Sequence, residues 1–595
     1  MKKMFSQGLA LAVLVGLTNC AYAAPATYNL DEMVVTASKT NLNLKELPQS
    51  AEIITQEEIK AVGATNVYEA LRAATNINAF EPSAANHRVQ VRGSNKILIL
   101  VNGHRITNDK SASDRVMERF NAGNIARIEI LRGPAATIYG SDAMAGVINI
   151  ITKKSVEPGT TIGVNSSRRQ TNNYYEFNTG KDGKAAASFS ANITKHRHLD
   201  WGEDAGTTAL EGLRQNFRFD VDYDMDEANK LFFALEYNKS DLDYYSKASM
   251  FGPGEWENMK KEIRTADLGY EGNFEKNKVV ANMTMSEVER ENDQKYHLYD
   301  IDARNAVKMN DKFTLTYGGE FRIDEAPVGD GREKSSDQWA AFVQGEYRVS
   351  DKLLVIPAIR YDDHESFGDH TSPSIGMTYF ISDDARLKAT YGTAYRAPSI
   401  KELYGGKYAN PNLKPEKSKG YEISYEQEFT DATSMKVAYF KNEEEDGIKM
   451  RYVEPYGYYN VDNAEYEGVE FALNHDLGNG FSAGFNYEYL DARDTSKGKN
   501  TRLKHTAPNT YTLRLQWTEP EEQEWSVTAW NKWISDYKDN NGDVRSINTL
   551  DLVVNKKWAD GKYNTYVGVD NLLDHDSSEL RYYGRMYRFG VEATF

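Results

Sequence analysis

The chain has 595 residues, a formal net charge of −17 at pH 7 and one cysteine, Cys20. The acidic balance disfavours a nucleic acid as partner. A single cysteine excludes a disulfide framework, and a mature chain that starts at Ala24 has no thiolate for a metal site or a nucleophile.

The first 23 residues are expected to be a secretory signal peptide. Two lysines at positions 2 and 3 precede an apolar stretch over residues 9–17 that is too short to span a bilayer, and Ala-Tyr-Ala at 21–23 is a small-x-small cleavage site. An N-terminal anchor helix and a lipoprotein built on Cys20 are the alternatives. Asn19 stands where a lipoprotein signal needs a small residue. Cleavage removes the two lysines, which changes the charge from −17 to −19.

A small α+β domain is predicted over residues 50–154, after a tail over residues 24–49. Gln56–Ala74 has helical spacing of its apolar residues and follows Thr55, which is a suitable N-cap. The apolar runs Ile97–Val101 and Val147–Ile151 and the alternating run Ile125–Leu131 predict short strands.

From about residue 155 the sequence alternates between apolar and polar side chains. Phe313–Ile323, Tyr421–Phe429 and Phe481–Tyr489 each place aromatic and aliphatic residues on one face and polar residues on the other, as expected for strands. The mean hydropathy is −0.66, yet the chain holds 38 tyrosines and 23 phenylalanines. A barrel with one lipid face and one wet face reconciles these values, because only alternate residues meet lipid.

Ten short turn signals divide this region at intervals of 32 to 50 residues, and each interval holds two strands and a longer loop. Ten turns separate eleven hairpins, so we predict a transmembrane barrel of 22 antiparallel strands over residues 155–595. A lumen of this width needs a plug, which assigns residues 50–154 to that role. A soluble repeat array is the alternative, but no residue motif recurs at this period. The signals lie near Asp182-Gly183, Asp226-Glu227, Lys276-Asn277, Asp311-Lys312, Asp351-Lys352, Asp383-Asp384, Thr430-Asp431, Gly478-Asn479, Pro520-Glu521 and Asp560-Gly561.

Seven motifs in order carry a family resemblance. They are VQVRGSNKILILVNGHRI (89–106), NIARIEILRGPAATIYGSDAMAGVINIITKK (124–154), YGTAYRAPSIKELYG (391–405), NPNLKPEKSKGYEIS (410–424), AEYEGVEFAL (464–473), VDNLLDHD (569–576) and GRMYRFGVEATF (584–595), which ends on an aromatic residue. With these motifs the chain resembles the TonB-dependent outer-membrane receptors, most closely their siderophore, colicin-I-type and vitamin B12 branch. The resemblance implies a receptor and importer in the bacterial outer membrane, not an enzyme, with no cofactor.

The resemblance also implies an energy-coupling segment at DEMVVTAS (31–38). Its β-branched residues favour an extended strand, which could pair with a sheet edge of TonB. The alternatives are a frayed tail and a first plug strand. The outer membrane has no ATP and the chain has no phosphate-binding GxxxxGK[ST] loop, so work is expected from the TonB–ExbB–ExbD complex. The residues assigned to TonB binding are Asp31, Glu32, Met33, Val34, Val35, Thr36 and Ala37.

By the same resemblance, Arg92 and Arg132 of the plug should face Glu422 and Glu470 of the barrel and lock the plug in place. Both glutamates fall on polar strand faces. A solvated position in a wet lumen is the alternative. A buried ion cluster contributes little net stability, which suits a part that must stay put and yet be released.

The cargo is expected to be a scarce metal chelate, most simply a ferric siderophore, with cobalamin and haem as alternatives. Haem receptors place a histidine between the YRAP and NPNL motifs, and residues 400–409 have none. Calcium could order the outer loops through Asp200, Asp204, Asp241 and Asp243, which lack EF-hand spacing. The candidate cargo residues are His87, Tyr404, Tyr408, Tyr456, Tyr458, Tyr582 and Tyr583, with Tyr459 beside them.

Two other classes of protein were weighed. An outer-membrane hydrolase would need a Ser/His or Asp/His constellation in a smaller barrel without a plug. A passive porin would lack the 50–154 domain and the coupling segment. The remaining expected partners are outer-membrane lipid and the barrel assembly machinery, and the receptor is expected to be a monomer.

Overall fold

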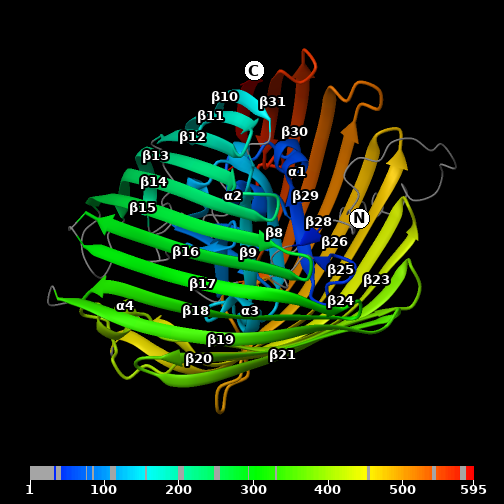
Figure 1. Ribbon diagram of the computed structural model, residues 1–595. Coiled ribbons are helices and arrows are strands. Elements are labelled where there is room, and N and C mark those ends of the chain that lie inside the picture. The colour runs from blue at the N-terminus through cyan, green and yellow to red at the C-terminus, as the bar shows by residue number, and fades with distance from the viewer. Residues whose placement is uncertain are drawn as a thin grey trace, which may run out of the picture.

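The computed structural model describes residues 33–34, 42–74, 77–83, 86–106, 116–154, 157–197, 207–246, 255–291, 294–328, 332–451, 454, 456–538, 544–575 and 584–595. Within them the chain forms a large closed β-barrel that surrounds a small α+β domain (Figure 1). The predicted signal peptide at 1–23 lies outside these ranges.

Among the described residues, no helix is long and apolar enough to cross a membrane.

The barrel has 22 antiparallel strands within the described part of the chain, which confirms the predicted count. The first strand pairs with the last, Thr161 opposite Thr594, and this pairing closes the ring. The short strand β27, two residues that pair with the end of β26, is additional to these 22, because β26 pairs directly with β28. The strands are β10 (Pro158–Ser167), β11 (Gln170–Asp182), β12 (Ala185–His196), β13 (Thr207–Asp224), β14 (Asn229–Ser246), β15 (Glu255–Asn273), β16 (Asn277–Arg290), β17 (Lys295–Asn310), β18 (Phe313–Pro327), β19 (Glu333–Ser350), β20 (Leu353–His364), β21 (Gly368–Phe380), β22 (Ala385–Arg396), β23 (Glu416–Thr430), β24 (Thr433–Arg451), β25 (Gly457–Gly478), β26 (Phe481–Asp494), β27 (Thr501–Arg502), β28 (Asn509–Thr518), β29 (Trp525–Lys538), β30 (Val544–Trp558), β31 (Tyr563–Asp570) and β32 (Met586–Thr594).

The period-2 pattern of the sequence sets which side chains face out. On β18, Tyr317 and Phe321 are 47% and 43% exposed, whereas the neighbouring Thr316 and Arg322 are buried. Each of the ten predicted short turns falls at the junction of two consecutive strands. Aromatic residues on the outer face and polar residues on the inner face are the arrangement of a barrel in a lipid bilayer around a wet or plugged lumen.

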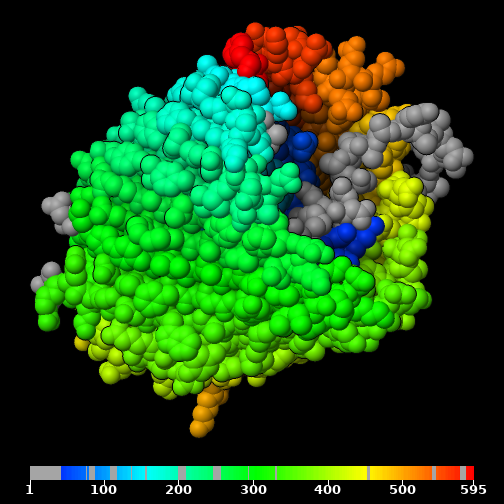
Figure 2. Space-filling model, viewed as in Figure 1, coloured from blue at the N-terminus to red at the C-terminus, as the bar shows by residue number. Residues whose placement is uncertain are grey.

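The plug domain inside the barrel is built on a five-stranded sheet of order β3-β8-β9-β6-β7. Only β6 and β9 in this sheet pair in parallel among the described residues. Figure 2 shows atoms of this domain, in blue, recessed within the opening of the barrel. Its strands are β3 (Ala51–Thr55), β4 (Ile77–Ser83), β5 (Asn86–Val91), β6 (Ile97–Val101), β7 (His104–Arg105), β8 (Ile125–Arg132) and β9 (Gly146–Thr152), and its helices are α1 (Gln56–Ala61), α2 (Val67–Ala73), α3 (Ala136–Tyr139) and the 3₁₀ turns η1 (Val116–Arg119) and η2 (Ala122–Asn124).

The single helix predicted over Gln56–Ala74 is wrong, because the structure has two short helices there. Thr55 caps α1 as predicted, through a capping box with Glu58. Gly63 then adopts a φ of +59°, which ends the first helix, and Asn66 caps α2 through the backbone N–H of Glu69. The apolar faces of both helices pack on β8 and β9 in the core of the plug.

The segment before the plug lies on the inner barrel wall. Strand β1 (Met33–Val34) pairs antiparallel with β2 (Leu42–Asn43). Leu42 packs on Leu354 and Ile356 of β20. The chain therefore lies against the barrel wall at Leu42, before the first strand of the plug.

Candidate functional site: the interface between plug and barrel

The four residues of the predicted lock lie together at this interface. Arg92 NH2 is 2.7 Å from Glu422 Oε2 and 2.7 Å from Glu470 Oε2, and Arg92 Nε donates to Glu470 Oε1 at 3.2 Å. Arg132 lies farther from the barrel glutamates than Arg92 does. Its Nε is 3.7 Å from Glu470 Oε1, and its Nη2 pairs with Glu52 of the plug itself. The plug arginine that touches both barrel glutamates is therefore Arg92.

A strained turn delivers Arg92 to the barrel. Val91 and Ser94 exchange two backbone hydrogen bonds, of 3.0 and 3.1 Å, and the residues between them, Arg92 and Gly93, have φ of +50° and +79°. A side chain at Gly93 would lie 2.7 Å from the Leu490 side chain. Arg92 adopts a left-handed conformation that is unfavourable for residues other than glycine. Its ion pairs must therefore hold the turn in place.

The charge on Arg92 is secured by its surroundings. Burial opposes that charge, but Glu470 and Glu422 outweigh the effect, and the pKa of Arg92 lies above its ordinary value. The guanidinium also lies 4.2 Å from the centre of the Phe440 ring. Breaking one partner of such a pair leaves a buried charge uncompensated, which is costly.

Sequence reasoning missed several neighbours of this cluster. Ser50 Oγ donates to Glu422 Oε1 at 2.5 Å, and Glu488 is the cross-strand partner of Glu470. The same plug turn also carries Lys96, whose Nζ is 2.8 Å from both Glu416 and Glu444. Alternation predicted polar faces for Glu422, Glu470 and Glu488, but no local pattern shows which plug residue each one meets.

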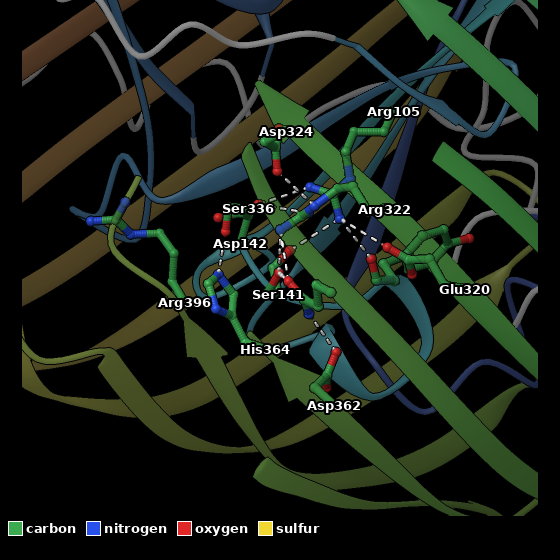
Figure 3. A network of polar contacts seen from close by, with 12 residues as sticks. Arg105, Ser141, Asp142, Glu320, Arg322, Asp324, Ser336, Asp362, His364 and Arg396 are labelled. Atoms are coloured by element: carbon green, nitrogen blue, oxygen red, sulfur yellow. Dashed lines mark hydrogen bonds and ion pairs between the residues drawn. The ribbon is translucent and has the colours of Figure 1, made fainter. Parts of the chain in front are cut away.

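A second polar cluster holds the plug loop that contains Ser141 and Asp142 (Figure 3). Arg105 of the plug donates to Asp142 Oδ2 at 2.9 Å and to the Ser141 carbonyl at 3.1 Å. Arg322 of the barrel reaches the same loop, at 3.3 Å from Ser141 Oγ and 3.5 Å from Asp142 Oδ2. Asp142 has a φ of +88°, so two arginines hold a strained loop against the wall.

Pro134 of the LRGP motif presses on two glycines of the barrel. Gly392 and Gly420 are cross-strand partners on β22 and β23. A Cβ added at Gly420 would lie 2.9 Å from Pro134 Cδ, and one at Gly392 would lie 3.3 Å from the Pro134 carbonyl oxygen. The two glycines therefore leave room for Pro134 to approach the backbone of the barrel wall.

Replacing Gly420 with valine should displace Pro134 and loosen the plug. Forcing extra methyl groups into a packed site costs about 1–3 kcal/mol. We expect higher ion conductance of the purified protein in planar bilayers. Gly319→Val on the outer face is the control, because its added Cβ meets Ala340 O, a barrel atom, at 3.1 Å. A Gly420→Val protein that conducts no more than the control would show that this contact does not hold the plug.

The segment leading into the plug is also fastened to the wall. Lys388 Nζ donates to the Leu44 carbonyl at 2.9 Å, and Thr378 Oγ1 donates to the Glu46 carbonyl at 2.8 Å. Arg348 NH2 donates to Glu46 Oε1 at 2.5 Å. Tension on the N-terminal segment must therefore pass these contacts before it reaches the plug sheet.

The candidate cargo tyrosines that the structure describes lie at the end of the barrel opposite the short turns, and Tyr458 is the second residue of β25. Tyr404 is half-buried on helix α4 (Ile400–Tyr404) and packs on an apolar cluster of the barrel mouth. Tyr408 and Tyr458 are joined by a backbone hydrogen bond of 2.9 Å from the Tyr458 N–H to the Tyr408 carbonyl. Tyr456 is 44% exposed. Tyr582 and Tyr583 fall outside the described residues.

Basic side chains lie over tyrosine rings at this end of the barrel. The cation lies 4.4 to 5.5 Å from the ring centre in each of four pairs. The pairs are Arg290 with Tyr296, Lys334 with Tyr404, Lys407 with Tyr408 and Arg451 with Tyr459.

His87 does not lie where a cargo ligand was expected. Its side chain is 2% exposed, stacks on Tyr68 at 3.6 Å between ring centres and lies 3.3 Å from Glu118. This position under the plug surface argues against a direct contact between His87 and cargo. A lone histidine in a sequence gives no sign of its burial.

The proposed calcium ligands and coupling residues are only partly described. Asn258 Nδ2 donates to Asp241 Oδ1 at 2.9 Å and to Asp243 Oδ1 at 2.7 Å, so an amide stands between these carboxylates. Asp200 and Asp204 lie outside the described residues, as do Asp31, Glu32, Val35, Thr36 and Ala37.

Comparison with known proteins gives consistent matches over most of the chain. Residues 156–572 match the model described as "TonB dependent receptor-like, beta-barrel", and residues 43–147 match "TonB-dependent Receptor Plug Domain". The vitamin B12 transporter BtuB of Photobacterium profundum is 27% identical over an alignment of 557 residues, and the match covers 86% of this chain and 86% of that protein.

Solved structures share the fold. The ferric enterobactin receptor PfeA of Pseudomonas aeruginosa has a TM-score of 0.78 at 19% identity and covers 92% of this chain and 99% of its own. The siderophore receptor PirA of Acinetobacter baumannii has a TM-score of 0.78 at 19% identity, with coverages of 92% and 98%.

Proposed function

Since this chain belongs to the TonB-dependent receptors of the bacterial outer membrane, we propose that its cargo is an anionic, aromatic metal chelate, a ferric siderophore of the catecholate type. The receptor binds the chelate at the cell surface and imports it into the periplasm. The work comes from TonB with ExbB–ExbD. Residues 31–37 pair with TonB as a strand, and the pull displaces or unfolds part of the plug.

The observation that carries this proposal is the set of cation–tyrosine pairs at the barrel mouth. A lysine or arginine supplies positive charge for an anionic chelate, and the ring beside it supplies a flat apolar face with a hydroxyl group. Lys334 over Tyr404 on α4 places both functions 4.4 Å apart. PfeA is named as a ferric enterobactin receptor and PirA as a siderophore receptor, which supports a siderophore as cargo.

Cobalamin is the second candidate, because the relative at 27% identity is a vitamin B12 transporter. Haem is less favoured, since His87 is buried and residues 400–409 contain no histidine. Native mass spectrometry of the purified receptor against a ferric triscatecholate, haemin and cyanocobalamin separates the three. Retention of cyanocobalamin alone would overturn the siderophore assignment.

Replacing Lys334 with glutamine should weaken binding of the ferric triscatecholate. The variant loses the positive charge that would meet the anionic chelate, and a hydrogen bond to a charged group contributes about 1.5–3 kcal/mol, so we expect at least roughly a tenfold increase in Kd, measured by quenching of tryptophan fluorescence. Tyr404→Phe keeps the ring and should change Kd less than Tyr404→Ala. Equal affinity in the parent and Lys334→Gln would remove this pair from the cargo site.

We propose the remaining partners on the basis of the family. The barrel assembly machinery inserts the strands, outer-membrane lipid surrounds their apolar face, and the receptor works as a monomer. The lock of Arg92, Arg132, Glu422 and Glu470 keeps the plug seated until TonB pulls.

A further inference from the structure

The plug turn that carries Arg92 is followed by a second, partly buried cation, Lys96. Its Nζ is held at 2.8 Å by Glu416 Oε1 and at 2.8 Å by Glu444 Oε2, and Ser94 Oγ donates to Glu444 Oε1 at 3.0 Å. Burial opposes the charge on Lys96, but Glu444 and Glu416 outweigh it and raise its pKa. Five residues of plug, from Arg92 to Lys96, are thus gripped by four barrel glutamates.

Glu416 connects this grip to the outer surface. It is fully buried at the start of β23, and its Oε1 accepts from Lys96 and from the backbone N–H of Ile448 at 2.6 Å. Its other oxygen, Oε2, pairs with Arg396, the last residue of β22. One carboxylate is therefore shared between a cation of the plug and a cation of the barrel rim.

Arg396 in turn holds the outer helix α4. Its NH1 and NH2 donate to Glu402 at 3.0 and 3.1 Å. Glu402 is fixed to α4 because it also closes the capping box with Ser399, where it accepts from the Ser399 backbone N–H at 2.7 Å. A shift of α4 must carry Glu402 with it.

We propose that Glu402, Arg396, Glu416 and Lys96 form a relay that reports the state of α4 to the plug turn. When α4 moves, Arg396 loses its ion pair with Glu402 and binds Glu416 more strongly. Lys96 then keeps its ion pair with Glu444, but its ion pair with Glu416 weakens. Residues 92–96 are therefore held less tightly by the barrel. Cargo binding is one cause of such a shift, because Tyr404 belongs to α4. This step rests on the proposed cargo site.

The chain offers a matched control in Glu444. Glu416 and Glu444 both bind Lys96 at 2.8 Å, but it is Glu416 that also pairs with Arg396. Glu444→Gln removes a charged contact to Lys96 of the same length, keeps an amide oxygen that can accept from Ser94 Oγ, and leaves the connection to α4 intact. A role in plug stability alone would give the two variants the same behaviour.

The test measures the affinity of purified full-length variants for the periplasmic domain of TonB, first without cargo. Glu402→Gln keeps the capping box, because glutamine also closes it, yet loses the charge that holds Arg396. We expect Glu402→Gln to raise TonB affinity about tenfold, within the usual range of coupling between sites. Adding Glu402→Gln to Glu416→Gln should change TonB affinity less than twofold, whereas adding it to Glu444→Gln should keep the tenfold step.

The second arm adds the ferric triscatecholate. The parent, Glu444→Gln and Lys96→Arg, which keeps the charge, should gain TonB affinity on binding the chelate, whereas Glu416→Gln should bind the chelate without that gain. A chelate that fails to bind the parent would count against the proposed cargo, and the first arm would still decide on the relay. Equal steps in the Glu416→Gln and Glu444→Gln backgrounds would overturn the relay. Heat-modifiable mobility in gels verifies that each barrel is folded.

Discussion

Replacing Val35 with proline is expected to abolish uptake while leaving cargo affinity unchanged. Proline has no backbone N–H and removes a hydrogen bond from any strand ladder in which it is placed centrally. The proposed contact with TonB is such a ladder, so its loss should lower the rate of energised uptake by at least about a hundredfold, the cost of roughly 3 kcal/mol. Uptake of an iron-labelled chelate by whole cells measures the rate.

Val35→Ile is the control, because isoleucine keeps the β-branched shape and the N–H. Cargo binding is measured on cells without energy, so that affinity and transport are separated. If Val35→Pro imported cargo at the parent's rate, the assignment of residues 31–37 to TonB would be wrong.

Replacing Arg92 with glutamate is expected to open the plug. The change removes the cation that lies 2.7 Å from both Glu422 and Glu470 and adds a third carboxylate among them. Loss of one partner from a buried ion pair costs about 3–5 kcal/mol. Cells should become sensitive to large antibiotics that the parent excludes, and the purified protein should conduct in planar bilayers.

Two further variants, a control and one with a smaller expected effect, test this prediction. Arg127→Glu reverses the charge of a plug arginine that donates to Glu129 of the plug itself, and it should not raise permeability. Arg132→Glu should have a smaller effect than Arg92→Glu, because Arg132 lies 3.7 Å from Glu470 and pairs with Glu52 inside the plug. An Arg92→Glu receptor as tight and active as the parent would refute the lock.

The barrel could be predicted from sequence because lipid imposes a simple rule. Along a membrane-spanning strand, side chains point alternately to lipid and to the lumen. On β18 the exposed Tyr317 and Phe321 therefore alternate with the inward Thr316 and Arg322. Short turns between strands favour residues such as Asp, Asn and Gly. These residues predicted the positions of all ten short hairpin turns. Strand count and closure followed from these two local signals.

The interior of the plug interface could not be predicted in the same way. Lys96 and Glu416 lie more than three hundred residues apart in the sequence, and the residues around either one do not predict contact with the other. Gly63 was absorbed into a helix because its neighbours have helical spacing, although its φ of +59° ends that helix. The lock residues were predicted from family motifs, and their geometry shows that Arg92 rather than Arg132 makes the direct contacts.

The central claim is that this receptor concentrates an anionic iron chelate by work drawn from TonB. The direct test is the time course of iron-labelled ferric triscatecholate uptake into cells that carry the receptor, with and without a functional TonB. We predict accumulation above the external concentration with TonB, and surface binding without accumulation when TonB is absent. Equal uptake in the two strains would contradict the account and would identify a passive pore.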